Sequence, residues 1–266
     1  MSKTGIIESD GRKIRYAEFG CGKKTFIILP GLSVKSVIDS AAVIKIQYAI
    51  FEKDYTVYVI DRNENVSGNY SAEKVAEDVL LCMDKLGIDK ADFFGASFGG
   101  MVAECIAAKY PERIERLVLG STCARRIEGS SRAIDLWIAL AEKGKRGLLL
   151  KQFAAGLYSE KFLEKNADFL DFSGDGITDE ELNRFIIYAK CAKNFNIYDD
   201  LDKIKCETLI IGAKNDKVIP IAAAEELFDK IKKSELYIYN EYGHSVFDEA
   251  PDYQERILNF LSKKRD

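Results

Sequence analysis

Three residues that lie far apart in the chain have the types and order needed for acyl-transfer chemistry. Ser97 is the central residue of a G-x-S-x-G pattern, which reads Gly-Ala-Ser-Phe-Gly at positions 95–99. A serine hydroxyl is a poor nucleophile unless a neighbouring base takes its proton. The chain has a single histidine, His244, and Asp216 is the acid that we expect to orient its imidazole. The order Ser97, Asp216, His244 is the order of nucleophile, acid and base expected for an enzyme built on an open sheet flanked by helices.

Each of these three residues is predicted to follow a β-strand. The strands are, in the same order, Ala91–Phe94, Thr208–Ile211 and Glu235–Tyr239. The first strand leads directly into a helix from about Phe98 to Tyr110, so that a sharp turn would hold the Ser97 hydroxyl above the sheet. The small residues that flank Ser97 permit such a turn. Because open parallel sheets have their sites at the carboxyl ends of the strands, we expect the three side chains to meet at this edge.

The sequence leaves a structural interpretation open for each residue. The pattern around Ser97 can be read as a glycine-rich turn that binds nothing, and His244 as an exposed loop residue. Asp216 can be read as only the cap of the turn before Pro220. Three other carboxylates are weaker candidates for the orienting acid, because they precede their strand and should lie at its far end. These are Asp199, Asp200 and Asp202.

A developing oxyanion needs hydrogen-bond donors, and two backbone amides are candidates. The N–H of Phe98 lies at the predicted start of its helix. The second donor is expected after strand Thr25–Leu29, where Gly31 lets the chain turn and would direct the Leu32 N–H inward. No cysteine cluster has zinc spacing, and one histidine cannot form a multi-histidine site. The expected chemistry therefore needs no metal and no organic cofactor.

The surrounding pattern predicts the frame that must position these residues. Strands and helices alternate over residues 1–120 and again over 201–266, which is typical of βαβ units around a buried, mainly parallel sheet. The expected elements include a hairpin at Asp10-Gly11 and helices over 34–52, 71–86 and 251–262, with Pro220 at the first position of another helix.

Residues 121–200 break this alternation. They contain helical stretches and no convincing strand; the stretches are 130–143, 146–157, 159–170 and 178–195. Thr178 and Glu181 fit a capping box at the start of the last one. The sequence therefore predicts an α/β core of residues 1–120 and 201–266, interrupted once by a helical cap at 121–200.

Composition excludes several classes of protein. The 266 residues are 47% hydrophobic and 31% charged, which is ordinary for a globular chain. A net charge of −4 makes nucleic acid an unexpected partner. No apolar run approaches the roughly 18 residues that span a bilayer, and the N-terminus has no signal-peptide pattern. The six cysteines form no CxxC pair, so we expect free thiols and a cytoplasmic protein.

Over essentially its whole length the chain resembles the α/β-hydrolase superfamily. Positions 95–103 are similar to the family's nucleophile elbow and helix, positions 212–220 to its acid loop, and positions 243–251 to its histidine loop. The chain is similar to small enol-lactonases, carboxylesterases, haloperoxidase-like perhydrolases and ring-fission C–C hydrolases. The resemblance implies an eight-stranded, mostly parallel sheet with helices on both faces and a helical cap.

The chain departs from this family at two places. Many relatives have His-Gly at the oxyanion loop, where this chain has Pro30-Gly31. Many relatives also have a Gly-x-Gly-x-Ser turn after the residue that corresponds to Asp61, whereas here positions 62–68 read RNENVSG. We expect this second loop to have a different shape and to help set specificity. A serine nucleophile argues against haloalkane dehalogenases and epoxide hydrolases, which use aspartate.

We therefore expect a serine hydrolase that cleaves a small carboxylic ester, lactone or thioester through an acyl-enzyme intermediate. One alternative is C–C bond hydrolysis or perhydrolysis by the same residues, and another is a protein that binds a ligand on a hydrolase scaffold without turnover. The expected partner is a small acyl substrate, and a homodimer is left open.

Cap residues are the candidates for the substrate pocket. The aromatic candidates are Trp137, Phe153 and Tyr158, followed by Phe162, Phe169 and Phe172. Ordinary packing within the cap is the alternative for each. Residues 121–151 hold seven Lys and Arg against three acids, which fits either an anionic substrate or a solvated helix face.

This mechanism predicts a pH dependence. The base must be neutral to accept the serine proton, so activity should fall below about pH 6–6.5, near the pKa of free imidazole. Initial rates of ester hydrolysis between about pH 4.5 and pH 9 measure this profile. A rate that stays flat down to about pH 4.5 would contradict a histidine base.

Overall fold

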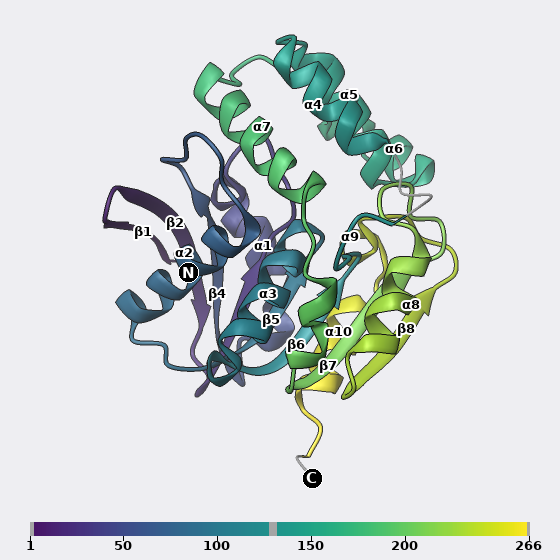
Figure 1. The fold of residues 1–266 in the computed structure, drawn as a ribbon. Coiled ribbons are helices and arrows are strands. Elements are labelled where there is room, and N and C mark those ends of the chain that lie inside the picture. Colours follow the sequence, from purple (N-terminus) through teal and green to yellow (C-terminus); the bar gives the residue numbers. More distant parts are fainter. Residues whose placement is uncertain (1–2, 128–131, 265–266) are drawn as a thin grey trace.

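A computed structural model describes residues 3–127 and 132–264, apart from the side chain of Phe169 (Figure 1). Its centre is one eight-stranded sheet in the order β1-β2-β4-β3-β5-β6-β7-β8. The pairs β1–β2 and β2–β4 are antiparallel, and all other neighbours are parallel. This confirms the expected mostly parallel sheet. The strands are β1 (Lys3–Ser9), β2 (Arg12–Gly20), β3 (Lys24–Leu29), β4 (Tyr55–Asn63), β5 (Ala91–Ala96), β6 (Ile114–Gly120), β7 (Glu207–Ala213) and β8 (Ser234–Tyr239).

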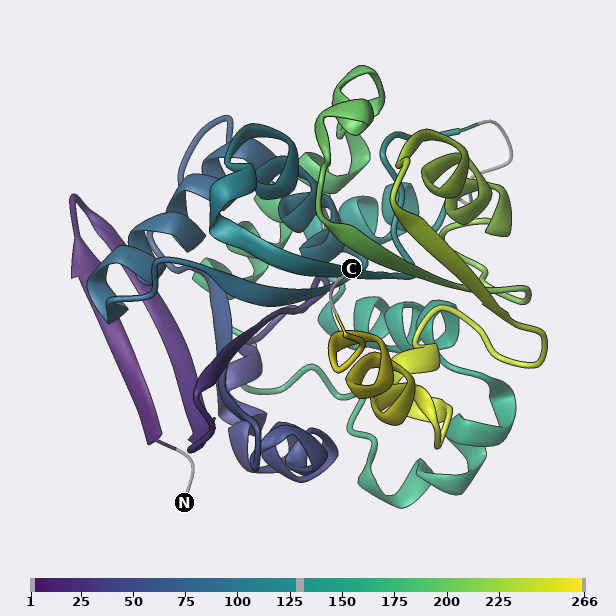
Figure 2. The same cartoon turned by 90° about the horizontal axis from the view of Figure 1, so that it is seen from below.

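Helices cover both faces of the sheet (Figure 2). One face carries α2 (Ala72–Leu86), α3 (Phe98–Lys109) and α8 (Ile221–Lys230), and the other carries α1 (Ala41–Gln47) and α10 (Tyr253–Leu261). A separate apolar cluster fills the space under each layer. The predicted ends of α2 are confirmed, since Ser71 caps its start and Gly87 ends it at φ 70°.

Between β6 and β7, the described residues form four α-helices, which group together at the top of Figure 1. They are α4 (Ala133–Glu142), α5 (Arg146–Leu157), α6 (Glu160–Lys165) and α7 (Asp179–Lys193). Within the described part of residues 121–200, the only β contact is an isolated bridge between Arg125 and Asn196. We call residues 121–200 the insertion. The Tyr188 hydroxyl donates to the Asn63 carbonyl at 2.8 Å, and Ser159 Oγ donates to Glu249 at 2.5 Å, so hydrogen bonds join the insertion to the sheet domain.

The segment 34–52 differs from the single helix that we predicted. It forms a 3₁₀ turn (Val37–Ser40), the short α1, and a second 3₁₀ turn (Ala49–Phe51). The chain bends at Tyr48, which is buried with Phe51. The Phe51 ring stacks on the Phe26 ring with centroids 4.7 Å apart. Burial of these aromatic rings against the sheet stabilises the bend more than a continuous helix would.

Other element ends also differ from the sequence prediction. Pro220 is the N-cap of α8 and not its first helical residue, because the Asp216 carboxylate binds the N–H groups of Val218 and Ile219 and keeps this stretch extended. The helix predicted over 159–170 is α6 followed by a 3₁₀ turn at Ala167–Phe169. A short helix, α9 (Val246–Glu249), precedes α10 and was not predicted.

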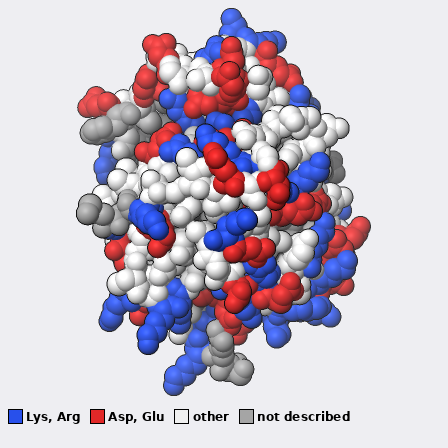
Figure 3. Space-filling model, turned by 90° about the vertical axis from the view of Figure 1, so that its left-hand side faces the viewer, with Lys and Arg blue, Asp and Glu red and all other residues white. Residues whose placement is uncertain are grey.

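Charged side chains of both signs are mixed over the face shown in Figure 3. All six cysteines are free, as predicted, while the cytoplasmic location stays a prediction. Within residues 3–127 and 132–264, no helix has the length and apolar character needed to cross a membrane.

The capping box of α7 is confirmed and yields a stability prediction. Thr178 Oγ1 accepts from the Glu181 N–H at 3.1 Å, and the Glu181 carboxylate accepts from the Thr178 N–H at 2.9 Å. Thr178→Ala should lower the free energy of unfolding by about 1 kcal/mol, because a helix N–H loses its acceptor. Thr178→Ser is the matched control, since it keeps the oxygen. Urea unfolding midpoints compare the three proteins, and an alanine variant as stable as the parent would contradict the prediction.

Candidate active site

Ser97 occupies a one-residue turn between β5 and α3. Its backbone has φ 51° and ψ −118°, in the left-handed region that side chains rarely adopt. The flanking glycines are required by space: a Cβ on Gly95 would lie 2.5 Å from the Gly99 carbonyl oxygen, and a Cβ on Gly99 would lie 2.0 Å from the Leu29 carbonyl oxygen. The G-x-S-x-G pattern therefore encodes the turn itself.

Hydrogen bonds hold this turn in place. The Ser97 N–H donates to the Gly120 carbonyl at 2.8 Å, and Thr122 Oγ1 donates to the Ser97 carbonyl at 2.8 Å. Glu104 is completely buried behind Thr122, and this burial raises its pKa well above the ordinary range.

The structure brings Ser97, His244 and Asp216 together at the carboxyl edge of the sheet. His244 Nε2 lies 2.9 Å from Ser97 Oγ, and His244 Nδ1 lies 2.8 Å from Asp216 Oδ2. The side chains of His244 and Asp216 are each only 2% exposed, so water does not compete for this contact. Asp216 Oδ1 accepts from the amides of residues 218 and 219 at 2.7 and 2.8 Å, which fixes the carboxylate.

The two amides predicted as oxyanion donors flank Ser97. Phe98 is the first residue of α3, and Leu32 follows Gly31 in the loop after β3. A Cβ on Gly31 would lie 3.3 Å from Ser97 Cβ, so this loop runs directly past the serine. Neither the Leu32 nor the Phe98 N–H donates a hydrogen bond to another residue in the described ranges. Both amides are therefore free to bind an oxyanion.

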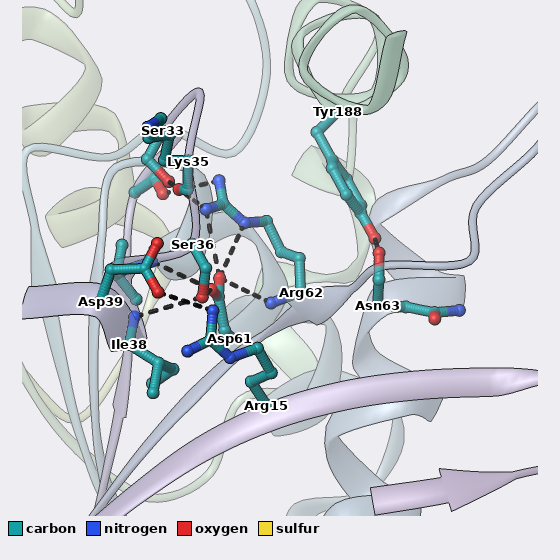
Figure 4. A network of polar contacts seen from close by, with 12 residues as sticks. Arg15, Ser33, Lys35, Ser36, Ile38, Asp39, Asp61, Arg62, Asn63 and Tyr188 are labelled. Carbon is teal, nitrogen blue, oxygen red and sulfur yellow. Dashed lines mark hydrogen bonds and ion pairs between the residues drawn. The ribbon is translucent and has the colours of Figure 1, made fainter. Parts of the chain in front are cut away.

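Sequence reasoning missed Arg62, which holds the loop that carries Leu32 (Figure 4). Arg62 Nη1 donates to the Gly31 carbonyl at 3.0 Å, and its Nη2 donates to Ser33 Oγ. The Gly31 carbonyl and the Leu32 N–H belong to one peptide unit. Because that unit is planar, a bond to its oxygen also orients its N–H.

Asp61 in turn holds Arg62 and the start of the 3₁₀ turn at Val37–Ser40. Asp61 Oδ1 accepts from the Arg62 N–H at 2.8 Å, while Oδ2 accepts from Ser36 Oγ at 2.6 Å and from the Val37 N–H at 3.0 Å. This network occupies the place where the sequence departs from the family pattern after Asp61. The signal that could have revealed this network was the pair of opposite charges, Asp61 and Arg62, at the carboxyl end of the predicted strand Tyr55–Ile60.

A cavity of about 270 Å³ lies beside Ser97 and His244, between the sheet edge and the insertion. Its wall is mainly apolar and includes the three predicted aromatic residues Trp137, Phe153 and Tyr158. Trp137 also packs on Phe153, with ring centroids 4.6 Å apart. These two residues therefore contribute to packing within the insertion and also line the cavity. Phe162 stacks on Tyr158 outside the wall. Phe172 does not line the cavity, and the side chain of Phe169 lies outside the described atoms.

The basic residues of 121–151 do not reach this cavity. No Lys or Arg of the described chain lines its wall. Arg125 pairs with Glu226 at 2.7 Å and Arg126 pairs with Asp135 at 3.0 Å, which favours the solvated-face interpretation. The polar wall residues that the sequence did not single out include Gln47, Tyr48 and Asp248. Within the described ranges, no group of three or more His, Cys, Asp or Glu side chains could hold a metal ion.

Known proteins share this architecture. A protein from Rhizobium rhizogenes named "Putative carbamate hydrolase RutD" is 27% identical over 198 residues, which cover 73% of this chain and 75% of that protein. A Pseudomonas putida protein named 2-hydroxy-6-oxononadienedioate/2-hydroxy-6-oxononatrienedioate hydrolase 1 is 24% identical over 94% of this chain and 92% of its own. The crystal structure of the enol-lactonase from Burkholderia xenovorans LB400 has the same fold, with a TM-score of 0.84 at 22% identity over 97% of this chain and 100% of that chain.

The family itself follows from a match that covers most of the sequence. The model of the family described as alpha/beta hydrolase fold matches residues 24–251. That span runs from β3 through α9, ends just before α10, and includes all three residues that meet at the sheet edge. This chain belongs to the α/β-hydrolase fold family.

Proposed function

We propose that this protein is a serine-dependent hydrolase that cleaves a small carboxylic ester, lactone or thioester through an acyl-enzyme intermediate. The observation that supports this most is the continuous contact from Ser97 Oγ through His244 to Asp216, at 2.9 and 2.8 Å, on the wall of a largely apolar cavity. Membership of a hydrolase family supports hydrolysis in general. The serine dependence and the ester substrate are our proposal.

The proposed reaction has two steps. His244 Nε2 takes the Ser97 proton as Oγ attacks the carbonyl carbon, and the Leu32 and Phe98 amides bind the oxygen that becomes negative. Asp216 accepts the Nδ1–H and so keeps the imidazole in the tautomer that can act as base. His244 then gives the proton to the leaving group. It next takes a proton from water, which attacks the acyl-enzyme and releases the acid.

Hydrolysis of a C–C bond is the second candidate, because one relative is named as a hydrolase of a hydroxy-oxo-dioate. A dioate has two carboxylates, and a site for it needs cationic or hydrogen-bond-donating partners. The cavity of this chain has no Lys or Arg among its described wall residues and instead includes the Asp248 carboxylate. This favours the ester, lactone or thioester substrate over a dicarboxylate.

An active-site probe tests the proposed nucleophile. A fluorophosphonate reagent should label the protein at Ser97 and leave Ser97→Ala unlabelled, and chromogenic esters of increasing acyl length should be hydrolysed by the parent only. Mass spectrometry of the labelled peptide and initial rates measure the two results. Equal melting temperatures of the two proteins serve as the folding control. Absence of labelling would favour a binding protein without turnover, and labelling without ester hydrolysis would favour C–C hydrolysis or perhydrolysis.

The contact of Arg62 with the Gly31 carbonyl predicts a positioning role. Arg62→Met should lower kcat at least about tenfold with little change in KM, because a misaligned oxyanion donor weakens transition-state binding more than substrate binding. Arg62→Lys should recover part of the rate, since it keeps a cationic donor.

Arg15→Met is the matched control for this experiment. Arg15 lies in the same network but pairs with Asp39 at 2.7 Å and does not contact the Gly31 loop (Figure 4). Its kcat should equal that of the parent. If Arg62→Met retains full kcat, or if both variants lose rate equally, Arg62 does not position the oxyanion loop.

A further inference from the structure

The cavity beside Ser97 contains one carboxylate that the proposed mechanism does not use. Asp248 lies in α9, four residues after His244, and lines the same wall as Ser97 and His244. Among the hydrogen bonds of the described residues, its carboxylate accepts from Gln47 and Tyr158, and none joins it to Ser97, His244 or Asp216. The question is which chemical group of a substrate this carboxylate would bind.

Asp248 is held by two neutral donors that come from distant parts of the chain. Gln47 Nε2 from α1 donates to Asp248 Oδ1 at 3.0 Å, and the Tyr158 hydroxyl from the end of α5 donates to Oδ2 at 3.1 Å. Gln47 is itself held, because its Nε2 also donates to the Phe247 carbonyl at 2.9 Å. The carboxylate therefore has a fixed position, and each oxygen keeps capacity to accept a further hydrogen bond.

The carboxylate faces the cavity and is not packed away. Its side chain is accessible to solvent, yet the burial of this region raises the pKa of the Asp248 carboxyl, and the Gln47 and Tyr158 hydrogen bonds lower it. Asp248 is exposed and lines the cavity wall, so a ligand in the cavity can reach its carboxylate. Asp248 forms no ion pair with any Lys, Arg or His of the described chain.

The other titratable groups around this point do not neutralise Asp248. They are Tyr48 and Tyr158 from the wall, the buried Tyr253, Glu249 next to Asp248 on α9, and His244 in the relay to Ser97. Glu249 points away from the cavity, where it accepts from the Ser159 N–H and hydroxyl at 2.9 and 2.5 Å. Among the described wall residues, the cavity has one carboxylate and no Lys or Arg, so its potential favours a positively charged ligand and opposes an anionic one.

We propose that Asp248, with Gln47 and Tyr158, forms a subsite that binds a protonated amino group of the substrate. This deepens the proposed function and rests on it, because it concerns the same cavity. A protonated amine supplies both a charge opposite to Asp248 and the N–H donors that its oxygens can still accept. The apolar wall, including Trp137 and Phe153, would contact the carbon chain between the amine and the carbonyl.

Binding can be measured without turnover, because Trp137 is the single tryptophan of the chain and lines the cavity. The protein is Ser97→Ala, and the ligands are n-hexylamine, hexan-1-ol and hexanoate at about pH 7.5, where an alkyl amine is protonated. Tryptophan fluorescence should report the amine as the tightest ligand, at least about tenfold tighter than the alcohol, with hexanoate the weakest, as expected for a charge-assisted hydrogen bond.

Two variants of neighbouring carboxylates separate recognition from structure. Asp248→Asn keeps the shape and a hydrogen-bonding oxygen but removes the charge, and the tenfold preference for the amine should disappear. Glu249→Gln removes a charge one residue away that does not face the cavity, and the preference should remain. Equal binding of amine and alcohol, or a preference that survives Asp248→Asn, would overturn the proposal.

Turnover distinguishes failure of this inference from failure of the proposed function. In the enzyme with Ser97 intact, p-nitrophenyl 6-aminohexanoate should have a kcat/KM at least about tenfold above that of p-nitrophenyl hexanoate, and Asp248→Asn should abolish this ratio. A second series with the amine on the alcohol side tests the other orientation, and a preference in either series supports the subsite. Hydrolysis of every ester without an amine preference overturns the subsite alone. An unlabelled Ser97 and no hydrolysis overturn the proposed function, while the fluorescence titration still tests the subsite.

Discussion

The imidazole of His244 has to contact Ser97 with one nitrogen and Asp216 with the other, and much of the structure serves this double contact. The ring is rigid, so the hydroxyl and the carboxylate must approach it from opposite sides within hydrogen-bond distance. They do so at 2.9 and 2.8 Å because β5, β7 and β8 run parallel and end at one edge of the sheet. The loops after these strands then need only a few residues each to bring the side chains together.

The turn at Ser97 is strained, and its surroundings hold it. A side chain at positive φ costs of order 1–3 kcal/mol, which a local turn cannot recover by itself. Here the Ser97 amide and carbonyl are both hydrogen-bonded, to Gly120 and Thr122, and close packing of the two flanking glycines leaves no room for another path. The strain places the hydroxyl at the cavity wall with the start of α3 beside it. Arg62 likewise holds the loop after β3. Its hydrogen bond to the Gly31 carbonyl fixes the plane of the peptide that carries the Leu32 N–H beside Ser97.

The polar and aromatic part of the cavity wall that faces the insertion combines residues from distant parts of the chain. Gln47 comes from α1, Trp137 and Tyr158 from the insertion, and Asp248 from α9. Hydrogen bonds from Gln47 and Tyr158 to Asp248 connect three of these parts at one carboxylate. Any motion of the insertion relative to the sheet would change this cluster, so the polar part of the wall and the placement of the insertion depend on each other.

Local constraints explain what the sequence by itself determined. The turn at Ser97, the cap pair Thr178 and Glu181, the mostly parallel sheet and the order of the three reactive residues are all encoded within short stretches or in the alternation of strands and helices. Tertiary structure alone decided the break at Tyr48, the contact of Arg62 with the Gly31 carbonyl, and the meeting of Gln47, Tyr158 and Asp248. These depend on side chains separated by tens to hundreds of residues, whose contacts arise only when the layers pack, and no periodicity within one segment encodes such a contact.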